Sequence, residues 1–353
     1  MNKIDHYLTT ALEQNASDLH FISGDPVRAR VHGKLRVIMD EKLTTEAVQE
    51  AMFEIMDGTT QKNFHEHNAA DFAYEIPGKS RFRINAFRHL NGIGAIMRAI
   101  PSKALTLDEL AMPRVIHDLC KYTSGMILVT GKTGSGKSTT LAAMIDAMNK
   151  RLKGHILTIE DPIEFVHKNQ GCLISQREVG VHSGSFSEAL HSALREDPDI
   201  VLVGEMRDLE TISIAVTAAE MGILVMGTLH TNGAAQTIDR IVNSFPADKQ
   251  SHIRTMISTS LRGVVSQQLL PTIHKPGRAA ALEVMVNTNA VANLIRQGKL
   301  DQIETAMQSG GAAGMKTMDN ALMELVEKGW VSGHEAYQQA DNKHKFESVK
   351  DIE

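Results

Sequence analysis

The sequence predicts an α/β protein of two domains, a small α+β domain followed by a larger domain built on a parallel sheet. From about residue 115 onward, short apolar runs alternate with stretches of helical periodicity. This is the pattern of a parallel sheet covered by helices on both faces. Before about residue 100, short strands and turn signals predominate instead. The length of 353 residues also favours two domains over one.

Residues 1–100 are predicted to form the small α+β domain. Its predicted elements are, in order, a helix over residues 4–12, short strands around the turns at 24–26 and 33, a helix over 44–66 and a strand pair at 71–75 and 81–86. The Pro77-Gly78 dipeptide predicts the turn between the paired strands. Residues 101–114 contain two prolines and several polar residues, so they are predicted to be a linker.

Residues 115–285 are predicted to form the core of the larger domain. Its predicted strands are four apolar runs, at 126–129, 156–159, 200–203 and 223–226, and its predicted helices include 186–194 and 211–219. Residues 286–353 are predicted to form a helical C-terminal region, which the glycine-rich segment 309–314 interrupts.

The composition is that of a soluble globular protein, with 42% hydrophobic and 22% charged residues. The net charge of −5 argues against nucleic acid or anionic lipid as a partner, because both attract basic surfaces. Cys120 and Cys172 are too few for a four-cysteine zinc site or a disulfide framework, so reduced thiols in the cytoplasm are expected. No signal peptide is recognisable, and no apolar run approaches the about 18 residues of a membrane span. We therefore expect no direct membrane insertion, and any association with a membrane to go through a partner.

Residues 131–138, Gly-Lys-Thr-Gly-Ser-Gly-Lys-Ser, have the spacing of a phosphate-binding loop. An apolar run precedes them and a helical pattern follows, which is the context that this motif requires. The glycines let backbone N–H groups point inward, and the helix start adds a partial positive charge. Lys137 is expected to reach the β- and γ-phosphates and Ser138 to bind Mg²⁺. The predicted nucleotide-binding residues are Thr133, Gly134, Ser135, Gly136, Lys137, Ser138 and Thr139.

Three carboxylates, Glu160, Asp161 and Glu164, follow the predicted strand 156–159. Ligands of doubly wound sheets gather beyond the carboxyl ends of the strands, so these side chains are candidates for the site. They would repel one another unless a cation such as Mg²⁺ lies between them. The alternative is a solvated acidic loop, but a phosphate loop in the same sheet favours the metal.

Glu205 follows the predicted strand 200–203, where ATPases place the carboxylate that orients the attacking water. We therefore predict Glu205 as the catalytic carboxylate. Gly204 stands where an aspartate usually does, so metal binding would depend on Ser138, waters and the acidic cluster. His230 follows the next predicted strand, and a structural histidine and a γ-phosphate sensor are equally good interpretations of it.

Between Glu75 and Asp108 the sequence contains no acidic residue but several basic ones. Arg81 and Arg83 alternate with apolar residues, so a strand would present both guanidinium groups on one face. Three interpretations are open at this point: a solvated basic face, contact with nucleic acid, and arginine fingers for a nucleotide, which are worth ~10³–10⁵ in rate.

Taken together, these motifs resemble those of the secretion ATPase superfamily, and within it the type IV pilus retraction ATPases (PilT-like). The resemblance covers nearly the whole chain. It is carried by segments 17–20 and 81–87, the phosphate loop 131–138, an aspartate box at 158–165, a Walker B segment at 194–208 and a histidine box at 227–231.

The resemblance implies a homohexameric ring whose subunits join a PAS-like N-terminal domain to a RecA-like P-loop ATPase domain, with ATP and Mg²⁺ bound between them. It implies catalytic roles for Arg83, Arg98, Arg195 and Arg207, for the carboxylate of Glu205 and for His230. Glu164 would help to position metal and water, so that Ser138 and Glu164 are the predicted metal ligands.

The resemblance also implies a cytoplasmic motor that removes pilin from the pilus base for twitching motility, held peripherally at the inner membrane through a platform protein. A four-cysteine zinc insertion and an extra N-terminal domain, usual in the extension and type II secretion ATPases, are absent from this sequence, which favours retraction. The family signature at 290–297 is only partly present, because Ala292 and Gln297 replace an arginine and a glutamate. An accessory PilU-like paralogue, working with a principal motor, is therefore an alternative. A nucleic-acid translocase is the alternative from another class.

Overall fold

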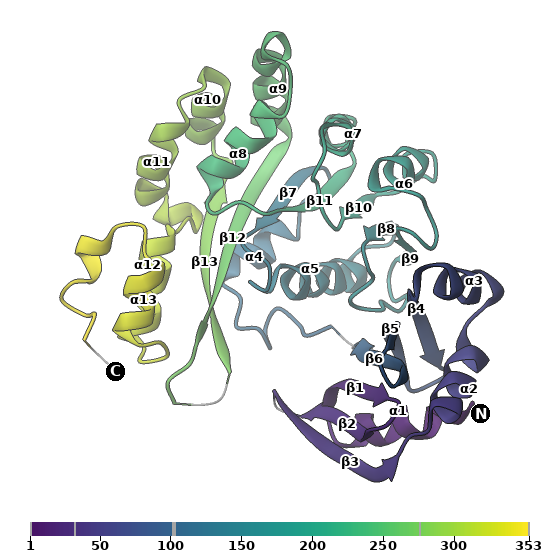
Figure 1. Ribbon diagram of the computed structural model, residues 1–353. Coiled ribbons are helices and arrows are strands. Elements are labelled where there is room, and N and C mark those ends of the chain that lie inside the picture. The colour runs from purple at the N-terminus through teal and green to yellow at the C-terminus, as the bar shows by residue number, and fades with distance from the viewer. Residues whose placement is uncertain (1, 32, 101–103, 275–276, 352–353) are drawn as a thin grey trace. The chain divides into compact units, whose positions relative to one another are not determined.

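The structure is a computed structural model that describes residues 2–31, 33–100, 104–274 and 277–351. The chain divides into two compact units, Met1–Lys103 and Ala104–Glu353. In Figure 1 the first unit runs from purple to blue and the second continues to yellow. In the part of the chain that the structure describes, no helix is both long and apolar enough to cross a bilayer.

The first unit is built on one antiparallel sheet of six strands in the order β3-β2-β1-β6-β5-β4. Its elements are α1 (Lys3–Glu13), β1 (Ala16–Ile22), β2 (Pro26–Val31), β3 (Lys34–Lys42), α2 (Thr45–Ile55), α3 (Gly58–His67), β4 (Ala69–Ile76), β5 (Ser80–His89) and β6 (Gly92–Ile100). Along β5, Phe82 and Ile84 are buried while Arg83 is exposed, so the alternation of the sequence does separate an apolar face from a basic one.

The single helix predicted over residues 44–66 is wrong, because two helices occupy this stretch. Helix α2 ends at Ile55 and α3 begins at Gly58. The Asp57 side chain accepts a hydrogen bond from Thr60 N at 2.7 Å and so caps the second helix. A capping residue followed by glycine favours a new start over a continued helix, and the apolar periodicity on both sides hides this break.

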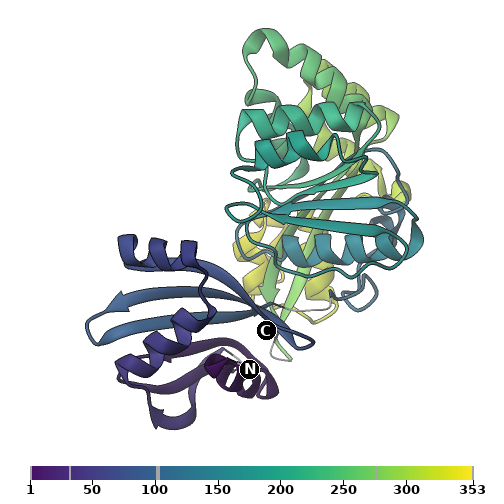
Figure 2. The same cartoon turned by 90° about the vertical axis from the view of Figure 1, so that its right-hand side faces the viewer.

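The second unit contains a seven-stranded sheet in the order β13-β12-β7-β11-β10-β8-β9. Its core elements are α4 (Arg114–Leu119), β7 (Gly125–Thr130), α5 (Lys137–Arg151), β8 (His155–Glu160), β9 (Leu173–Glu178), α6 (Phe186–Ala193), β10 (Ile200–Val203), α7 (Leu209–Glu220), β11 (Leu224–Leu229), α8 (Ala234–Asn243), α9 (Ala247–Ser260), β12 (Leu261–Pro271) and β13 (Arg278–Val286). Helices lie on both sides of this sheet (Figure 2).

Both faces of the sheet are buried, as the continuous apolar runs predict. On β7, Leu128 packs into one hydrophobic cluster with α6, α7 and α8, while Ile127 and Val129 pack into another with α4 and α5. All neighbouring strands pair in parallel except β12 and β13, which are antiparallel over Gly263–Pro271. The predicted all-parallel sheet therefore needs correction at this edge.

Strands β9, β12 and β13 were not predicted from the sequence. Strand β9 lies at the edge of the sheet and is largely polar, so it lacks the apolar run that revealed its neighbours. Strand β12 carries Ser266, Gln267 and Gln268 in its middle. Ser266 Oγ accepts a hydrogen bond from Gly233 N, next to α8, and Gln267 Oε1 accepts one from Thr140 Oγ1 on α5. Both partners come from other elements, which the local sequence does not reveal.

The predicted linker needs a second correction. Residues 101–103 lie outside the described residues. Residues 104–113 belong to the second unit, where Leu107 and Met112 are buried in the cluster around α4 and α5. Pro113 directly precedes helix α4, and the apolar residues before it anchor this stretch to the domain.

The C-terminal region is helical, as predicted. It consists of α10 (Asn289–Gln297), α11 (Ile303–Ser309), α12 (Met318–Glu327) and α13 (Gly333–Gln339), with short 3-10 turns at Leu300–Gln302, Gly311–Ala313 and Lys343–Phe346. Helices α10 and α11 pack into the cluster formed with α8 and α9. Helices α12 and α13 lie instead along the β12–β13 pair (Figure 1). Leu322 of α12 and Phe346 of the last 3-10 turn are fully buried in this contact.

Candidate nucleotide site

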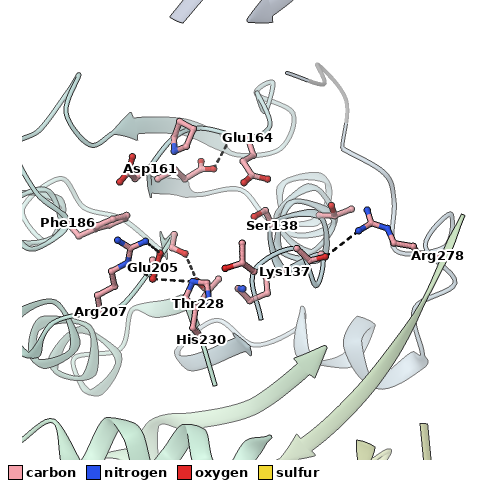
Figure 3. A pocket seen from close by; sticks show the side chains of 17 residues that line it. Lys137, Ser138, Asp161, Glu164, Phe186, Glu205, Arg207, Thr228, His230 and Arg278 are labelled. Carbon is pink, nitrogen blue, oxygen red and sulfur yellow. Dashed lines mark hydrogen bonds and ion pairs between the residues drawn. The ribbon is translucent and has the colours of Figure 1, made fainter. Parts of the chain in front are cut away.

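A cleft of about 400 Å³ lies beyond the carboxyl ends of β7, β8, β10 and β11. This is the edge at which a doubly wound sheet gathers its ligands. The loop between β7 and α5 forms one wall. The cleft collects residues from six separate stretches of sequence, and Figure 3 shows their side chains converging on it.

The loop before α5 has the conformation that phosphate binding requires. Gly134 and Gly136 have φ of 80° and 89°, a left-handed region that residues with a Cβ seldom adopt. A Cβ on Gly131 would lie 2.3 Å from the carbonyl oxygen of Gln267, so strand β12 comes too close for any side chain there. Helix α5 then begins at Lys137 and directs its free N–H groups toward the cleft.

Lys137 is half-buried at the mouth of this loop. Its Nζ donates hydrogen bonds to the carbonyl oxygens of Gly131, at 2.8 Å, and Lys132, at 3.1 Å. Burial lowers the pKa of Lys137, and the negative charges of Glu205 and Glu164 oppose that effect. The ammonium group is therefore held near the loop within the field of two carboxylates, where an added phosphate would compensate its burial.

Six of the seven predicted nucleotide-binding residues line the cleft, namely Thr133, Gly134, Gly136, Lys137, Ser138 and Thr139. Ser135 is different, because its side chain is buried and its Oγ has no hydrogen-bond partner among the described residues. Its side chain lies beside Gly131 in the base of the loop. Ser135 can therefore contribute its backbone to a phosphate site.

The acidic residues after β8 lie in the same cleft, and β9 holds them there. Gln176 on β9 donates from Nε2 to the Phe165 carbonyl oxygen at 2.9 Å and to Glu160 Oε1 at 3.2 Å. Glu178, also on β9, accepts a hydrogen bond from Ile163 N at 3.2 Å. These anchors position the whole segment 160–165, and no local pattern in the sequence indicates them.

Glu160 differs from its acidic neighbours because it is deeply enclosed. Burial raises the pKa of Glu160, against hydrogen bonds from Thr158 and Gln176 that favour its ionised form. Asp161 and Glu164 also line the cleft but are more open to solvent. Glu160 therefore forms part of the cleft wall, while Glu164 faces the cleft opposite Lys137 and Ser138 (Figure 3).

The residues of this cleft fit Mg²⁺ in a particular way. Among the described residues, no group of three or more His, Cys, Asp or Glu side chains is arranged to hold a metal, so the three carboxylates after β8 are not a cage of their own. The hydroxyl of Ser138 and the carboxylate of Glu164 nevertheless line one cleft with the phosphate loop. Mg²⁺ typically binds one or two protein oxygens together with substrate phosphates and waters, and this donor set suits that mode.

Glu205 lies at the end of β10 between Arg207 and His230. Arg207 Nη2 donates to Glu205 Oε2 at 2.6 Å, and Arg207 Nε also pairs with this carboxylate. His230 Nε2 lies 3.2 Å from Glu205 Oε1. Burial acts to raise the pKa of Glu205, but the hydrogen bond from Arg207 and the charges of Arg207 and His230 outweigh it, so the pKa is lowered. His230 therefore lines the same cleft as Glu205, and its role as a γ-phosphate sensor stays a prediction.

Three further residues line the cleft and were not found from the sequence: Phe186, Thr228 and Arg278. Thr228 Oγ1 donates to the Gly204 carbonyl oxygen at 2.5 Å and so joins β11 to β10 beside Glu205. Arg278 Nη1 donates to the Gly134 carbonyl oxygen at 3.4 Å. In Figure 3 Arg278 lies on the other side of the phosphate loop from Glu205. It comes from β13, the strand whose pairing only the tertiary structure reveals.

Arg195 does not line this cleft. It lies in a separate cleft between β9, α6 and α7, with Arg177 and His191. Within one chain the structure therefore does not bring Arg195 together with Lys137 and Glu205, although a role there was predicted.

Arg83 and Arg98 belong to the first unit, where they are direct cross-strand partners on β5 and β6. Arg98 is in turn opposite Asp18 on β1, so the three residues form a row across one face of the sheet. Arg98 Nε donates to Asp18 Oδ1 at 2.8 Å, and Asp18 is buried. This pairing fixes the guanidinium group of Arg98 while leaving it 70% exposed.

Comparisons with known proteins agree with this architecture. A family model described as Type II/IV secretion system protein matches residues 1–345. A type IV pilus retraction ATPase, PilT, from Pseudomonas aeruginosa is 51% identical over 96% of this chain and 98% of its own length. A type IV pilus ATPase, PilU, from the same organism is 38% identical over 96% of this chain and 89% of its own length.

A crystal structure of the pilus retraction motor PilT with bound ADP is similar to this structure, with a TM-score of 0.91 and 40% sequence identity over 98% of each chain. This likeness confirms the predicted fold class, a small α+β domain followed by a P-loop α/β domain with a helical C-terminal region. Nucleotide is thus bound by a protein of the same fold and of recognisably similar sequence.

The pairing of Glu205 with Arg207 predicts a pH effect. Arg207 holds the pKa of Glu205 down, so Arg207→Ala should let that pKa rise. If ionised Glu205 is required for turnover, activity is lost as pH falls through its pKa, and the acid limb of the pH profile of kcat/KM should move to higher pH. Arg114→Ala, which removes an exposed arginine of α4 paired with Asp118, is the matched control and should leave the limb in place. An unmoved acid limb in Arg207→Ala would contradict the arrangement.

Proposed function

Because this chain belongs to the Type II/IV secretion system protein family, we propose that it is an ATP-hydrolysing motor that powers the retraction of a type IV pilus. The observation that carries the proposal is the meeting of two groups in one cleft, the phosphate loop with Lys137 and the carboxylate of Glu205 held by Arg207 and His230. The 51% identity to PilT supports retraction as the work that the hydrolysis drives.

The proposed mechanism assigns binding and hydrolysis to different walls of the cleft. The loop amides and Lys137 bind the β- and γ-phosphates. Ser138 and Glu164 would hold Mg²⁺, which neutralises charge on the phosphates when it is bound. Glu205 accepts a hydrogen bond from the attacking water and orients it toward the γ-phosphate. His230, within contact of Glu205, is placed to respond to the phosphate that leaves.

Arginines are proposed to stabilise the charge that spreads over the γ-phosphate during cleavage. Arg207 is the candidate inside the cleft. Because it already donates to Glu205, its N–H groups would have to be shared between Glu205 and the γ-phosphate. Arg83, Arg98 and Arg195 are retained as candidates from the family resemblance. For Arg83 and Arg98 we propose that nucleotide binding engages the basic face of the first unit, so that hydrolysis is coupled to movement of that unit.

We further propose that the working form is a homohexamer in the cytoplasm, docked on a platform protein at the inner membrane. A motor must push against a fixed partner, and the described part of the chain offers no spanning helix of its own. A ring also allows each subunit to use arginines that its own cleft does not contain, as Arg195 would require.

Replacement of the proposed catalytic carboxylate should separate binding from turnover. Glu205→Gln should lower kcat by about 100-fold or more, since general-base and water-positioning groups contribute 10²–10⁴-fold. The affinity for a non-hydrolysable ATP analogue, measured by calorimetry, should change little because Glu205 contributes no phosphate ligand. Glu210→Gln, an exposed acid on α7, is the matched control. Normal turnover in Glu205→Gln would refute the assignment.

The arginines of the first unit provide a second test. Arg83→Ala should reduce steady-state ATP turnover by about 10³-fold if its guanidinium group stabilises the transferring phosphoryl group. Arg36→Ala on β3, an exposed arginine of the same unit, should leave turnover unchanged. Full activity in Arg83→Ala would remove the first unit from the chemistry.

The cellular task is tested by deletion in the source organism. Loss of a retraction motor should leave excess surface pili and abolish twitching, whereas loss of an extension motor would leave no pili. A gene with Lys137→Ala should fail to restore twitching, because the loop then lacks its phosphate-binding ammonium group. Restoration by that variant would show that ATP binding at this loop is not needed for the task.

An accessory, PilU-like role is the second candidate, and the altered signature at Ala292 and Gln297 favours it. The deletion distinguishes the two, since an accessory protein is dispensable when a principal motor is present. A nucleic-acid translocase predicts instead an ATPase activity that DNA or RNA stimulates and that salt weakens steeply.

A further inference from the structure

Glu283 is a buried carboxylate on β13 that binds the first residues of two helices at once. Its side chain is 8% exposed. Oε1 accepts a hydrogen bond from Ala234 N at 2.7 Å, and Oε2 accepts one from Met318 N at 3.1 Å. Ala234 begins α8 and Met318 begins α12. A helix start carries unpaired N–H groups and a partial positive charge, so one carboxylate here serves two positive ends.

On the α8 side, Glu283 is connected to the nucleotide cleft through a short and tightly held loop. His230 lines the cleft, and residues 231–233 lead from it directly to Ala234. Gly233 N donates to Ser266 Oγ on β12 at 2.9 Å. Thr237 Oγ1 donates to the Gly233 carbonyl oxygen at 2.7 Å. Both of these bonds hold the α8 end of the loop, and at its other end Thr231 Oγ1 lies 2.8 Å from Thr237 Oγ1 of α8. We therefore expect a displacement of His230 to be passed to the start of α8.

Gly233 is the last residue of this loop and lies beside the carboxylate of Glu283. Its φ of 100° lies in the region that favours glycine. A Cβ at this position would lie 3.4 Å from Glu283 Oε1. A side chain there would therefore make an ordinary van der Waals contact with the oxygen that caps α8, which shows that the loop passes beside it.

On the α12 side, the residues around Glu283 form a clamp. Val284 N donates to the Lys316 carbonyl oxygen at 2.9 Å, and Lys316 N donates back to the Val284 carbonyl oxygen at 3.0 Å. Thr317 caps α12 by accepting from Asn320 N at 3.4 Å. The start of α12 is thus tied to β13 at the residue next to Glu283, and α12 packs with α13 into one apolar cluster.

We propose that Glu283 is a positioning residue that transmits the nucleotide state of the cleft from the His230 loop to the C-terminal helix α12. The two oxygens belong to one planar group, so a shift of Ala234 N tilts that group and alters the hydrogen bond to Met318 N. The inference rests on the proposed nucleotide site and adds to it a route by which the C-terminal helices respond to the phosphates.

Hydrogen exchange of the full-length chain, with and without Mg²⁺ and a non-hydrolysable ATP analogue, tests this transmission. In the unaltered protein the analogue should change the amide exchange rates of residues 318–321 by about fivefold or more. This is the lower end of the coupling usually found between two linked sites. Glu283→Gln keeps the shape of the side chain but exchanges one acceptor for a donor. The change at 318–321 should then disappear, while the affinity for the analogue, measured by calorimetry, stays within about threefold.

Thr317→Ala is the matched control, because it removes the cap of α12 without touching α8 or Glu283. It should raise exchange at 318–321 with and without the analogue, and the nucleotide-dependent difference should persist. If Glu283→Gln does not fold, Ser266→Ala serves instead. That change frees Gly233 from β12 and should reduce the difference while leaving both bonds of Glu283 in place.

The outcomes separate the two proposals. An analogue that binds the unaltered chain without changing exchange at 318–321 overturns the role of Glu283 and leaves the nucleotide site standing. The same holds if Glu283→Gln retains the full nucleotide-dependent difference. An unaltered chain that binds no analogue overturns the proposed function, and the transmission route with it.

Discussion

Burial of β7 on both faces is the constraint on which the rest of the second unit depends. The strand pairs with β11 on one side and β12 on the other, and its side chains enter two separate hydrophobic clusters. This pairing and packing fix the position of the end of β7 at Thr130, and the glycine loop begins directly after it. The backbone of β12 leaves no room for a Cβ at position 131, so only glycine fits at the start of the loop. The geometry of the phosphate site thus comes from packing behind it.

The charges of the cleft are balanced in pairs. Lys137 stands opposite the carboxylates of Glu164 and Glu205, and Glu205 is in turn shared with Arg207 and His230. Each of these interactions would be rearranged by a triphosphate, because phosphate oxygens compete for the same donors. A site in which binding must exchange partners is suited to signalling its occupancy to the surrounding elements. His230 takes part in this exchange through Glu205, and it lies four residues before the start of α8.

The mixed edge of the sheet links this chemistry to the C-terminal helices. Strands β12 and β13 carry the close contact at Gly131, the side chain of Arg278 at the cleft and the carboxylate of Glu283. The same pair packs against α12 and α13 through Leu270 of β12 and through Ala279 and Ala281 of β13. One antiparallel pair therefore touches both the phosphate loop and the C-terminal region, whereas the polar row of Asp18, Arg98 and Arg83 organises the first unit separately.

Local sequence by itself determined the phosphate loop, the strand tips bearing Glu164, Glu205 and His230, and the alternation of Arg83 with buried residues. These features depend on spacing within a few residues, which periodicity and motif can report. Tertiary structure alone decided the packing of residues 104–113 and the pairing of β12 with β13. It also decided that Ser135 faces inward, that Arg278 reaches the loop and that Arg195 lies elsewhere. Each of these depends on contacts between residues distant in the chain. Such contacts produce no recognisable hydrophobic pattern in the local sequence.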